Sequence, residues 1–205
     1  MDFKGLIGQT LEHFRIPLDE AGLMRLVRFV GELDRWNRRI NLVGLKDMER
    51  VCRELLADSF FLHAFIKDRS ALVDVGSGSG ILAVPLAILN EGITVHSVDS
   101  SVKKMQFQRH VRRMLELRNL MPQEGRVEVI DPLKADGLVA KAYGTTRAIL
   151  TAADRHVASG GLVFVLKGKK ENERPCPGYG VEKNLSYALP GVAKEYRLLI
   201  YKKVS

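Results

Sequence analysis

Apolar residues recur at intervals of three and four through the first third of the chain. This spacing is typical of amphipathic helices that bury one face. A second stretch with the same period runs from about Asp47 through Leu62, and residues 41–44 form the loop between the two. We therefore expect a helical N-terminal cap over residues 1–68. Its clearest apolar series is Leu23, Leu26, Val27, Val30, Leu33 and Trp36.

The pattern changes at Ala71, where a short apolar run, residues 71–75, is closed by glycines. Such a run predicts a buried strand of a parallel sheet. Helix and strand patterns then alternate, which indicates a doubly wound, mainly parallel, Rossmann-like α/β sheet over residues 69–205. A polar stretch rich in glycine and proline, Gly168–Gly180, predicts an exposed loop. The expected helices are 79–90 and 101–118, and the further strands are 93–98, 126–130, 143–149, 162–166 and 196–203.

A glycine-rich segment joins the first predicted strand to the helix after it. Glycine permits positive φ and lets a ligand approach the backbone, and the start of a helix offers unpaired N–H groups. Asp99 ends the next predicted strand, 19 residues after Gly80, where a carboxylate can accept both hydroxyls of a ribose. This order predicts a nucleotide-binding site. The segment itself contains Asp74, Gly76, Ser77, Gly78 and Gly80.

Two ligand classes use such a turn. The dinucleotide fingerprint has glycines at G-x-G-x-x-G/A, and Ala83 can serve as its third small residue, so the glycine spacing alone does not decide. Asp74 does discriminate, because a carboxylate at the mouth of the turn repels a pyrophosphate and attracts an ammonium. S-adenosylmethionine has an ammonium, a ribose diol and no phosphate. We therefore favour S-adenosylmethionine over NAD.

Charge and cysteine content narrow the classes of partner. The formal net charge is +8, which favours polyanions such as nucleic acid. Cys52 and Cys176 share no metal-ligand spacing with each other or with the five histidines, so we expect neither a disulfide scaffold nor a metal. The chain begins without a signal-peptide pattern. Its longest apolar run, residues 81–89, is far shorter than the roughly 20 residues of a membrane span, and we expect a cytoplasmic protein without membrane contact.

Short motifs in a fixed order along almost the whole chain resemble one family, the bacterial ribosomal small-subunit methyltransferase G family, also called glucose-inhibited division protein B. This resemblance implies a class I methyltransferase sheet with a helical cap. It also implies methyl transfer from S-adenosylmethionine to guanine N7 in a loop of 16S rRNA, with 16S rRNA or the small ribosomal subunit as partner. We expect a monomer. The motifs are Trp36-Asn37, Asn41-Leu42, Asp58-Ser59, the segment from Asp74 to Gly80, Pro85-Leu86, Asp99-Ser100 with Lys103 and Phe107, Arg147-Ala148, and Leu166-Lys167-Gly168.

The chain also departs from the family pattern. Glu54 and Leu55 stand where the family usually has Arg-His, and Leu82 and Ala83 stand where it usually has Pro-Gly. With the strands placed as above, the arginine usual just after strand three is missing. The acid usual at the start of strand four then corresponds to Ala142. These differences bear mainly on the RNA target.

Methylation of guanine N7 needs no general base, because N7 offers a lone pair and no proton must leave. Positioning alone can supply roughly 7–11 kcal/mol. Arg147, at the end of predicted strand four, is the candidate catalytic residue, because its planar fork can hold a phosphate or a base edge. Asp131, after predicted strand three, is expected near the adenine amino group. The expected cofactor-binding residues are Asp74, Gly76, Ser77, Gly78, Gly80, Asp99, Ser100, Ile130, Asp131 and Arg147, and the expected RNA-binding residues are Lys103, Lys167, Lys169 and Arg197.

Other functions remain open at this point. Cytosine-C5 methylation needs a cysteine nucleophile, but Cys176 lies in the polar loop after predicted strand five, so we interpret it as a loop thiol. The alternatives are a class I methyltransferase with another RNA target, a non-catalytic RNA-binding relative that kept the fold, and an NAD-dependent oxidoreductase.

Overall fold

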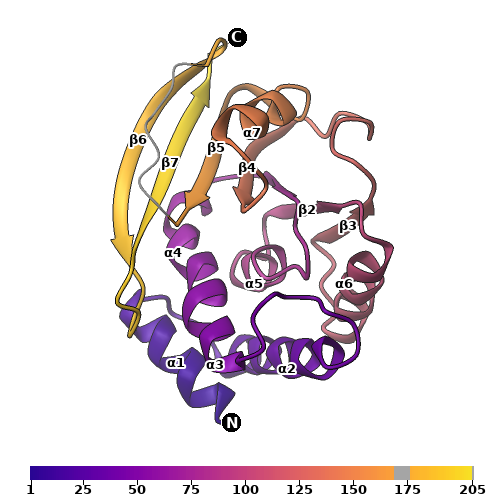
Figure 1. The fold of residues 1–205 in the computed structure, drawn as a ribbon, viewed down its shortest axis with the longest axis vertical. Coiled ribbons are helices and arrows are strands. Elements are labelled where there is room, and N and C mark those ends of the chain that lie inside the picture. The colour runs from indigo at the N-terminus through magenta and orange to yellow at the C-terminus, as the bar shows by residue number, and fades with distance from the viewer. Residues whose placement is uncertain (169–175, 205) are drawn as a thin grey trace.

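A computed structural model describes residues 1–168 and 176–204. These residues form one seven-stranded sheet with the order β3-β2-β1-β4-β5-β7-β6, flanked by helices (Figure 1). The helices are α1 (Phe3–His13), α2 (Glu20–Asn37), α3 (Met48–Arg50), the π-helix η1 (Val51–Leu56), α4 (Ala57–Ile66), α5 (Ala83–Leu89), α6 (Val102–Met114) and α7 (Thr146–Ala153). The strands are β1 (Ala71–Val75), β2 (Thr94–Asp99), β3 (Leu120–Glu124), β4 (Ala135–Lys141), β5 (Val157–Lys167), β6 (Tyr179–Ala188) and β7 (Glu195–Lys203).

The predicted helical cap is present, and side-chain caps fix where its helices begin. Asp2 Oδ1 accepts a hydrogen bond from Gly5 N at 2.9 Å, and Asp19 Oδ1 accepts one from Gly22 N at 2.7 Å. The apolar face of α2 is completely buried at Leu26 and Phe29, and α2 packs against α5 and α6. In Figure 1, α1, α2 and α3 lie along the lower side of the molecule, and α4 runs upward to the left of α5. The boundary at residues 68 and 69 stays a prediction.

The mainly parallel sheet expected from the sequence is confirmed. Strands β1 to β5 pair in parallel, while β7 pairs antiparallel with β5 and β6. Alternate residues of β1 face opposite sides, so Leu72 packs with α4, α5 and the cap, while Val73 packs with α7. Parallel strands carry their carboxyl ends to one edge. Asp99, Lys141 and Lys167 are therefore the last residues of three parallel strands at that edge.

Two predicted strands were placed wrongly. Strand three is Leu120–Glu124 and not 126–130, and strand four is Ala135–Lys141 and not 143–149. The period-two pattern at 126–130 misled because its Val129 is 72% exposed and belongs to a loop. The true β3 is an edge strand with a proline and polar residues, which an edge position tolerates. Residues 146–149 begin α7, where Thr145 Oγ1 accepts from Ala148 N at 3.2 Å.

The C-terminal hairpin differs from the expectation in another way. The predicted exposed loop 168–180 overlaps β6, which begins at Tyr179 and pairs along β7. Much of β6 is exposed to solvent on this outer edge, so its sequence lacks the apolar run of a buried strand. Residues 169–175 of that loop, including Lys169, lie outside the described residues. Cys176 forms an isolated bridge with Tyr179, in agreement with a loop thiol.

Candidate functional site

The glycine turn after β1 has the backbone conformation that its sequence predicts. Gly76, Gly78 and Gly80 have φ values of +67°, +60° and +75°, which side chains rarely adopt. A methyl group on Gly76 would lie 2.6 Å from the Tyr143 ring, whereas nothing lies closer than 3.9 Å to one on Gly78. Gln108 Nε2 fixes the turn by donating to Ser77 Oγ at 2.9 Å and to Gly78 O at 2.8 Å. The turn is thus rigid and open at Gly78.

Asp99 ends β2 beside this turn. Its Oδ2 accepts a hydrogen bond from Gly78 N at 2.9 Å, and its Oδ1 accepts one from Ser101 N at 2.8 Å. Each carboxylate oxygen can accept a further bond, so a pair of ligand hydroxyls can be received there. Asp99 lines a first hollow of about 400 Å³. The other residues that line it are Val75, Gly76, Val98, Ser100, Gly125, Arg126, Val127, Glu128, Val129 and Tyr143.

Asp74 lies in a second, smaller hollow of about 170 Å³, formed by the glycine turn, Leu42 and Lys141. The residue is only 2% exposed, and among the described residues nothing donates a hydrogen bond to its Oδ2. Burial raises the pKa of Asp74 to about 7. A buried carboxylate oxygen without a donor is costly, and a ligand cation in the hollow would stabilise it.

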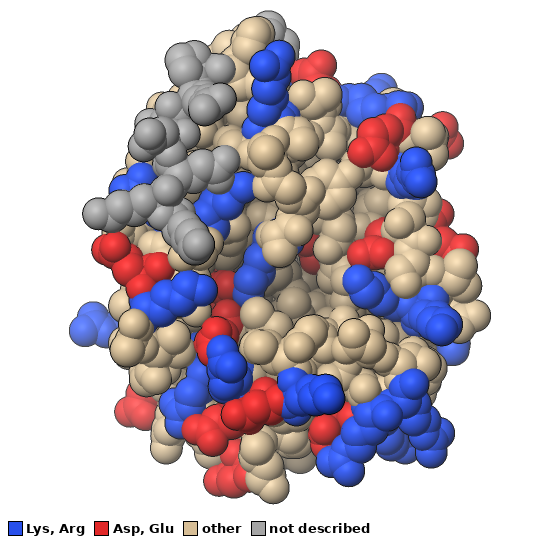
Figure 2. All heavy atoms as spheres, in the orientation of Figure 1, with Lys and Arg blue, Asp and Glu red and all other residues tan. Residues whose placement is uncertain are grey.

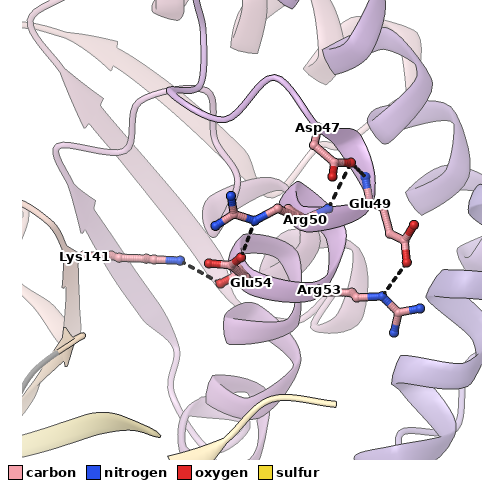
Figure 3. Close-up of polar contacts among 6 residues, drawn as sticks. All are labelled: Asp47, Glu49, Arg50, Arg53, Glu54 and Lys141. Atoms are coloured by element: carbon pink, nitrogen blue, oxygen red, sulfur yellow. Dashed lines mark hydrogen bonds and ion pairs between the residues drawn. The ribbon is translucent and has the colours of Figure 1, made fainter. Parts of the chain in front are cut away.

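A third hollow of about 210 Å³ adjoins the second, because Leu55, Lys141 and Ala142 line both. Lys141 Nζ lies 2.5 Å from Asp58 Oδ2, and Asp58 Oδ1 accepts a hydrogen bond from Tyr187 Oη at 2.6 Å. Lys141 Nζ also donates to the backbone oxygen of Glu54 at 3.3 Å, and Figure 3 shows it reaching from β4 toward η1. The ammonium of Lys141 is therefore fixed between the second and third hollows.

The corrected strands change which residues occupy the site. Arg126, Val127 and the backbone of Gly125 line the first hollow, and Ile130 and Asp131 do not. Arg147 lies in the first turn of α7 and lines a separate hollow with Glu128 and Arg155, so its predicted position at the end of strand four is wrong. Lys141 takes that position. The catalytic role predicted for Arg147 and the cofactor contacts predicted for Ile130 and Asp131 stay predictions.

Two supposed departures from the family pattern follow from the misplaced strands. Arg126 comes directly after β3 and Gly125, so an arginine does follow strand three. Asp136 stands near the start of β4, where Ser70 N and Ala71 N donate to its carboxylate at 2.8 and 3.0 Å. Arg126, Lys141 and Tyr143 line these hollows but were not among the site residues predicted from the sequence. The run before Lys141 was the available signal, since residues 135–140 are apolar apart from Asp136.

The predicted RNA-binding residues are spread over two regions. Lys103 is exposed on α6, while Lys167 lines the third hollow and pairs in register with Arg197 of β7. Figure 2 shows a hollow at the centre of this face with basic side chains around it, and a second basic cluster at the lower right, where Figure 1 draws the right-hand end of α2 below α6. Part of the cap's charge is neutralised by ion pairs, as at Arg25 with Glu91 and Arg38 with Asp34.

Within the described residues, no cluster of three or more His, Cys, Asp or Glu side chains has a geometry that would hold a metal ion. The helices of this part of the chain include none that is long and apolar enough to cross a membrane.

The doubly wound sheet, the glycine turn and the acids at the ends of β1 and β2 define a class I S-adenosylmethionine-dependent methyltransferase. The chain belongs to the GidB family of rRNA small subunit methyltransferase G, whose model matches residues 23–175. It is similar to two proteins named ribosomal RNA small subunit methyltransferase G. The one from Bordetella pertussis is 31% identical over 80% of this chain and 75% of that protein, and the one from Stenotrophomonas maltophilia K279a is 33% identical over 94% and 93%.

Solved structures support the fold. The crystal structure of M. jannaschii TYW2 in complex with AdoMet matches with a TM-score of 0.58 at 15% identity, over 73% of this chain and 76% of that one. Family membership confirms the function expected from the sequence, which is methylation of guanine N7 in 16S rRNA with S-adenosylmethionine as methyl donor. It decides against the NAD-dependent and non-catalytic alternatives.

Proposed function

We propose that the first and second hollows together bind S-adenosylmethionine. The observation that carries this proposal is Asp74, a buried carboxylate whose Oδ2 has no donor among the described residues. In this arrangement Asp74 receives the ammonium of the amino-acid moiety and Asp99 receives the ribose hydroxyls. The adenine lies in the first hollow against Val127 and Tyr143, with Ser100 at its edge. The apolar part of that lining fits an aromatic base.

The chemistry requires positioning more than proton transfer. S-adenosylmethionine, when bound, supplies a methyl group that its positive sulfur already activates. Guanine N7 would form its bond to the methyl carbon with its lone pair as the S–CH3 bond breaks and S-adenosylhomocysteine leaves; no proton has to be removed, so the chain needs no general base. Lys141 lies where the second hollow meets the third hollow. Its ammonium can donate a hydrogen bond to guanine O6, the neighbour of N7. Asp58 and Tyr187 hold Lys141 in that place, which makes them positioning residues.

The wider basic surface would bind the rRNA backbone. Lys103 is exposed on α6, and Lys167 pairs in register with Arg197 at the sheet edge. Phosphate contacts of this kind supply affinity without reading sequence. Our proposal includes a monomer that acts in the cytoplasm, on free 16S rRNA or on the small subunit.

Mass spectrometry of rRNA nucleosides tests this function. We expect 7-methylguanosine in 16S rRNA of the source cells to fall by one modified residue per molecule when the gene is deleted, and to return when the gene is supplied again. An unchanged 7-methylguanosine content after deletion would exclude the proposal.

A further inference from the structure

The third hollow has the walls of a nucleobase pocket. Tyr187 and Tyr196 line one part of it, and their rings stack on each other with centroids 5.6 Å apart. Phe61 stacks behind Tyr187 at 3.9 Å with an interplanar angle of 11°, so this aromatic wall is rigid. Leu55 and Leu166 supply apolar lining. Enzymes that modify a base in RNA hold the unstacked base between aromatic and apolar side chains.

Two carboxylates lie in this lining, and one of them, Asp58, is paired with Lys141 and Tyr187. Glu54 Oε1 accepts a hydrogen bond from Arg50 Nε at 2.7 Å, and this bond lowers the pKa of Glu54. The side chain is 19% exposed, so its environment is partly shielded from water. Burial and the nearby Glu54 charge raise the pKa of Tyr196 to about 12. The hollow thus presents a negative acceptor beside a neutral phenol.

The π-helix η1 places Glu54 in the hollow. Its wider turn presents consecutive residues, Glu54 and Leu55, to the same cavity. Short π-helical segments are rare and occur frequently at functional sites. Figure 3 shows Glu54 and Lys141 approaching one another from η1 and β4.

The order of these groups matches the edge of one base. Guanine carries N7, O6, N1–H and the 2-amino group in sequence along its rim. Lys141 lines both hollows, whereas Glu54 lines only the third. When N7 points toward the second hollow, O6 lies next to Lys141, and N1–H and the 2-amino group lie next to Glu54. Adenine offers an acceptor at N1, which a carboxylate repels.

We propose that the third hollow is the subsite for the target guanine and that Glu54 is the residue that recognises it, through hydrogen bonds from N1–H and the 2-amino group to its carboxylate. This inference rests on the proposed function, since it takes N7 as the atom methylated.

The competing explanation is that Glu54 only stabilises η1 through Arg50. Three variants separate the two. Glu54→Gln removes the negative acceptor, Arg50→Gln removes the same ion pair but leaves the carboxylate, and Glu49→Gln removes a neighbouring pair, with Arg53 at 2.9 Å, outside the hollow. Circular dichroism and S-adenosylmethionine affinity are measured first, to establish that each variant is folded and loaded.

We expect Glu54→Gln to lower kcat/KM for 16S rRNA methylation by about 10- to 100-fold, the range of a lost charged contact to a base. Arg50→Gln and Glu49→Gln should stay within about threefold of wild type. Equal losses for Glu54→Gln and Arg50→Gln, or no loss for Glu54→Gln, would overturn the assignment.

Calorimetry with nucleotides gives a second readout that does not need turnover. With S-adenosylhomocysteine bound, wild type should bind GMP several-fold more tightly than IMP, which lacks the 2-amino group, and Glu54→Gln should bind both alike. Equal binding of GMP and IMP by wild type would contradict the proposal. If wild type formed no 7-methylguanosine, the proposed function would fail, and this titration would still decide whether the hollow recognises guanine.

Discussion

Lys141 Nζ lies 2.5 Å from Asp58 Oδ2, and this contact joins the end of β4 to helix α4. Asp58 is 1% exposed, so its charge depends on this lysine and on the Tyr187 hydroxyl for compensation. The ion pair with Asp58 also fixes the Lys141 ammonium at the boundary between the second and third hollows. The ion pair between Lys141 and Asp58 should therefore affect both the stability of the fold and the position of the Lys141 ammonium in the site.

Removing the lysine should destabilise the protein, because it leaves a buried carboxylate uncompensated. We expect Lys141→Met to lower the free energy of unfolding by about 3 kcal/mol, measured by urea denaturation. Lys183→Met, at an exposed position on β6, is the matched control and should change stability by less than about 0.5 kcal/mol. Similar stabilities of the two variants would show that the ion pair contributes little.

Asp74 should make the binding of S-adenosylmethionine and S-adenosylhomocysteine dependent on pH. Because burial raises its pKa to about 7, the carboxyl is increasingly protonated below that value and then no longer attracts an ammonium. We expect the Kd for S-adenosylhomocysteine to rise by up to about tenfold per unit as the pH falls below 7. Calorimetry on Asp74→Asn should show weaker binding with no such slope. A pH-independent Kd in wild type would argue against an ionic contact there.

The same residue should affect stability in the absence of ligand. Its folded pKa lies above the unfolded value of 3.8, so the folded state binds more protons between pH 4 and 7 and stability falls as the pH rises through this window. Asp74→Asn should lose this decrease and should be more stable than wild type at pH 8. Thermal unfolding of both proteins from pH 5 to 8 measures the difference. Parallel curves would mean that Asp74 has an ordinary pKa.

The glycine turn should tolerate no side chain at Gly76. Gly76→Ala combines a φ of +67° with a methyl group 2.6 Å from the Tyr143 ring, so we expect a loss of about 2 kcal/mol in stability and weaker donor binding. Gly8→Ala provides the contrast, because Gly8 lies in α1 with open space around it. It should raise stability by roughly 0.5–1 kcal/mol. Wild-type affinity in Gly76→Ala would indicate that the turn rearranges.

The stability of the contact between the helical cap and the core should depend on Trp36, which belongs to the apolar series predicted to be buried. Its ring lies 5.4 Å from Phe107 and stacks on His110 of α6, and its Nε1 donates to Glu32 at 3.1 Å. We expect Trp36→Ala to lower stability by about 2–3 kcal/mol and Trp36→Phe by about 1 kcal/mol. Calorimetric unfolding tests this order, and equal stabilities would remove Trp36 from the cap–core contact.

Local patterns of residues were sufficient to predict the residues around the glycine turn. The glycine turn and Asp99 could be placed because strand, turn and helix follow one another within a few residues. Strands three and four could not, because β3 is an edge strand with a proline and few apolar side chains. That error moved the end of strand four from Lys141 to Arg147, and it hid Arg126 and Asp136 as members of the family pattern.

The third hollow lies beyond what a sequence pattern can predict. Glu54 comes from η1, Lys141 from β4, and Tyr187 and Tyr196 from the two strands of the C-terminal hairpin. These residues are brought together only by tertiary packing, and β6 had no apolar pattern to mark it as a strand. A departure such as Glu54 became interpretable only once its neighbours were known.

A crystal structure of the protein with S-adenosylhomocysteine tests the central claim most directly. The account predicts adenine in the first hollow beside Val127, both ribose hydroxyls on Asp99, and the ammonium within hydrogen-bond distance of Asp74 Oδ2. A ligand bound elsewhere, or one whose ammonium points away from Asp74, would contradict it.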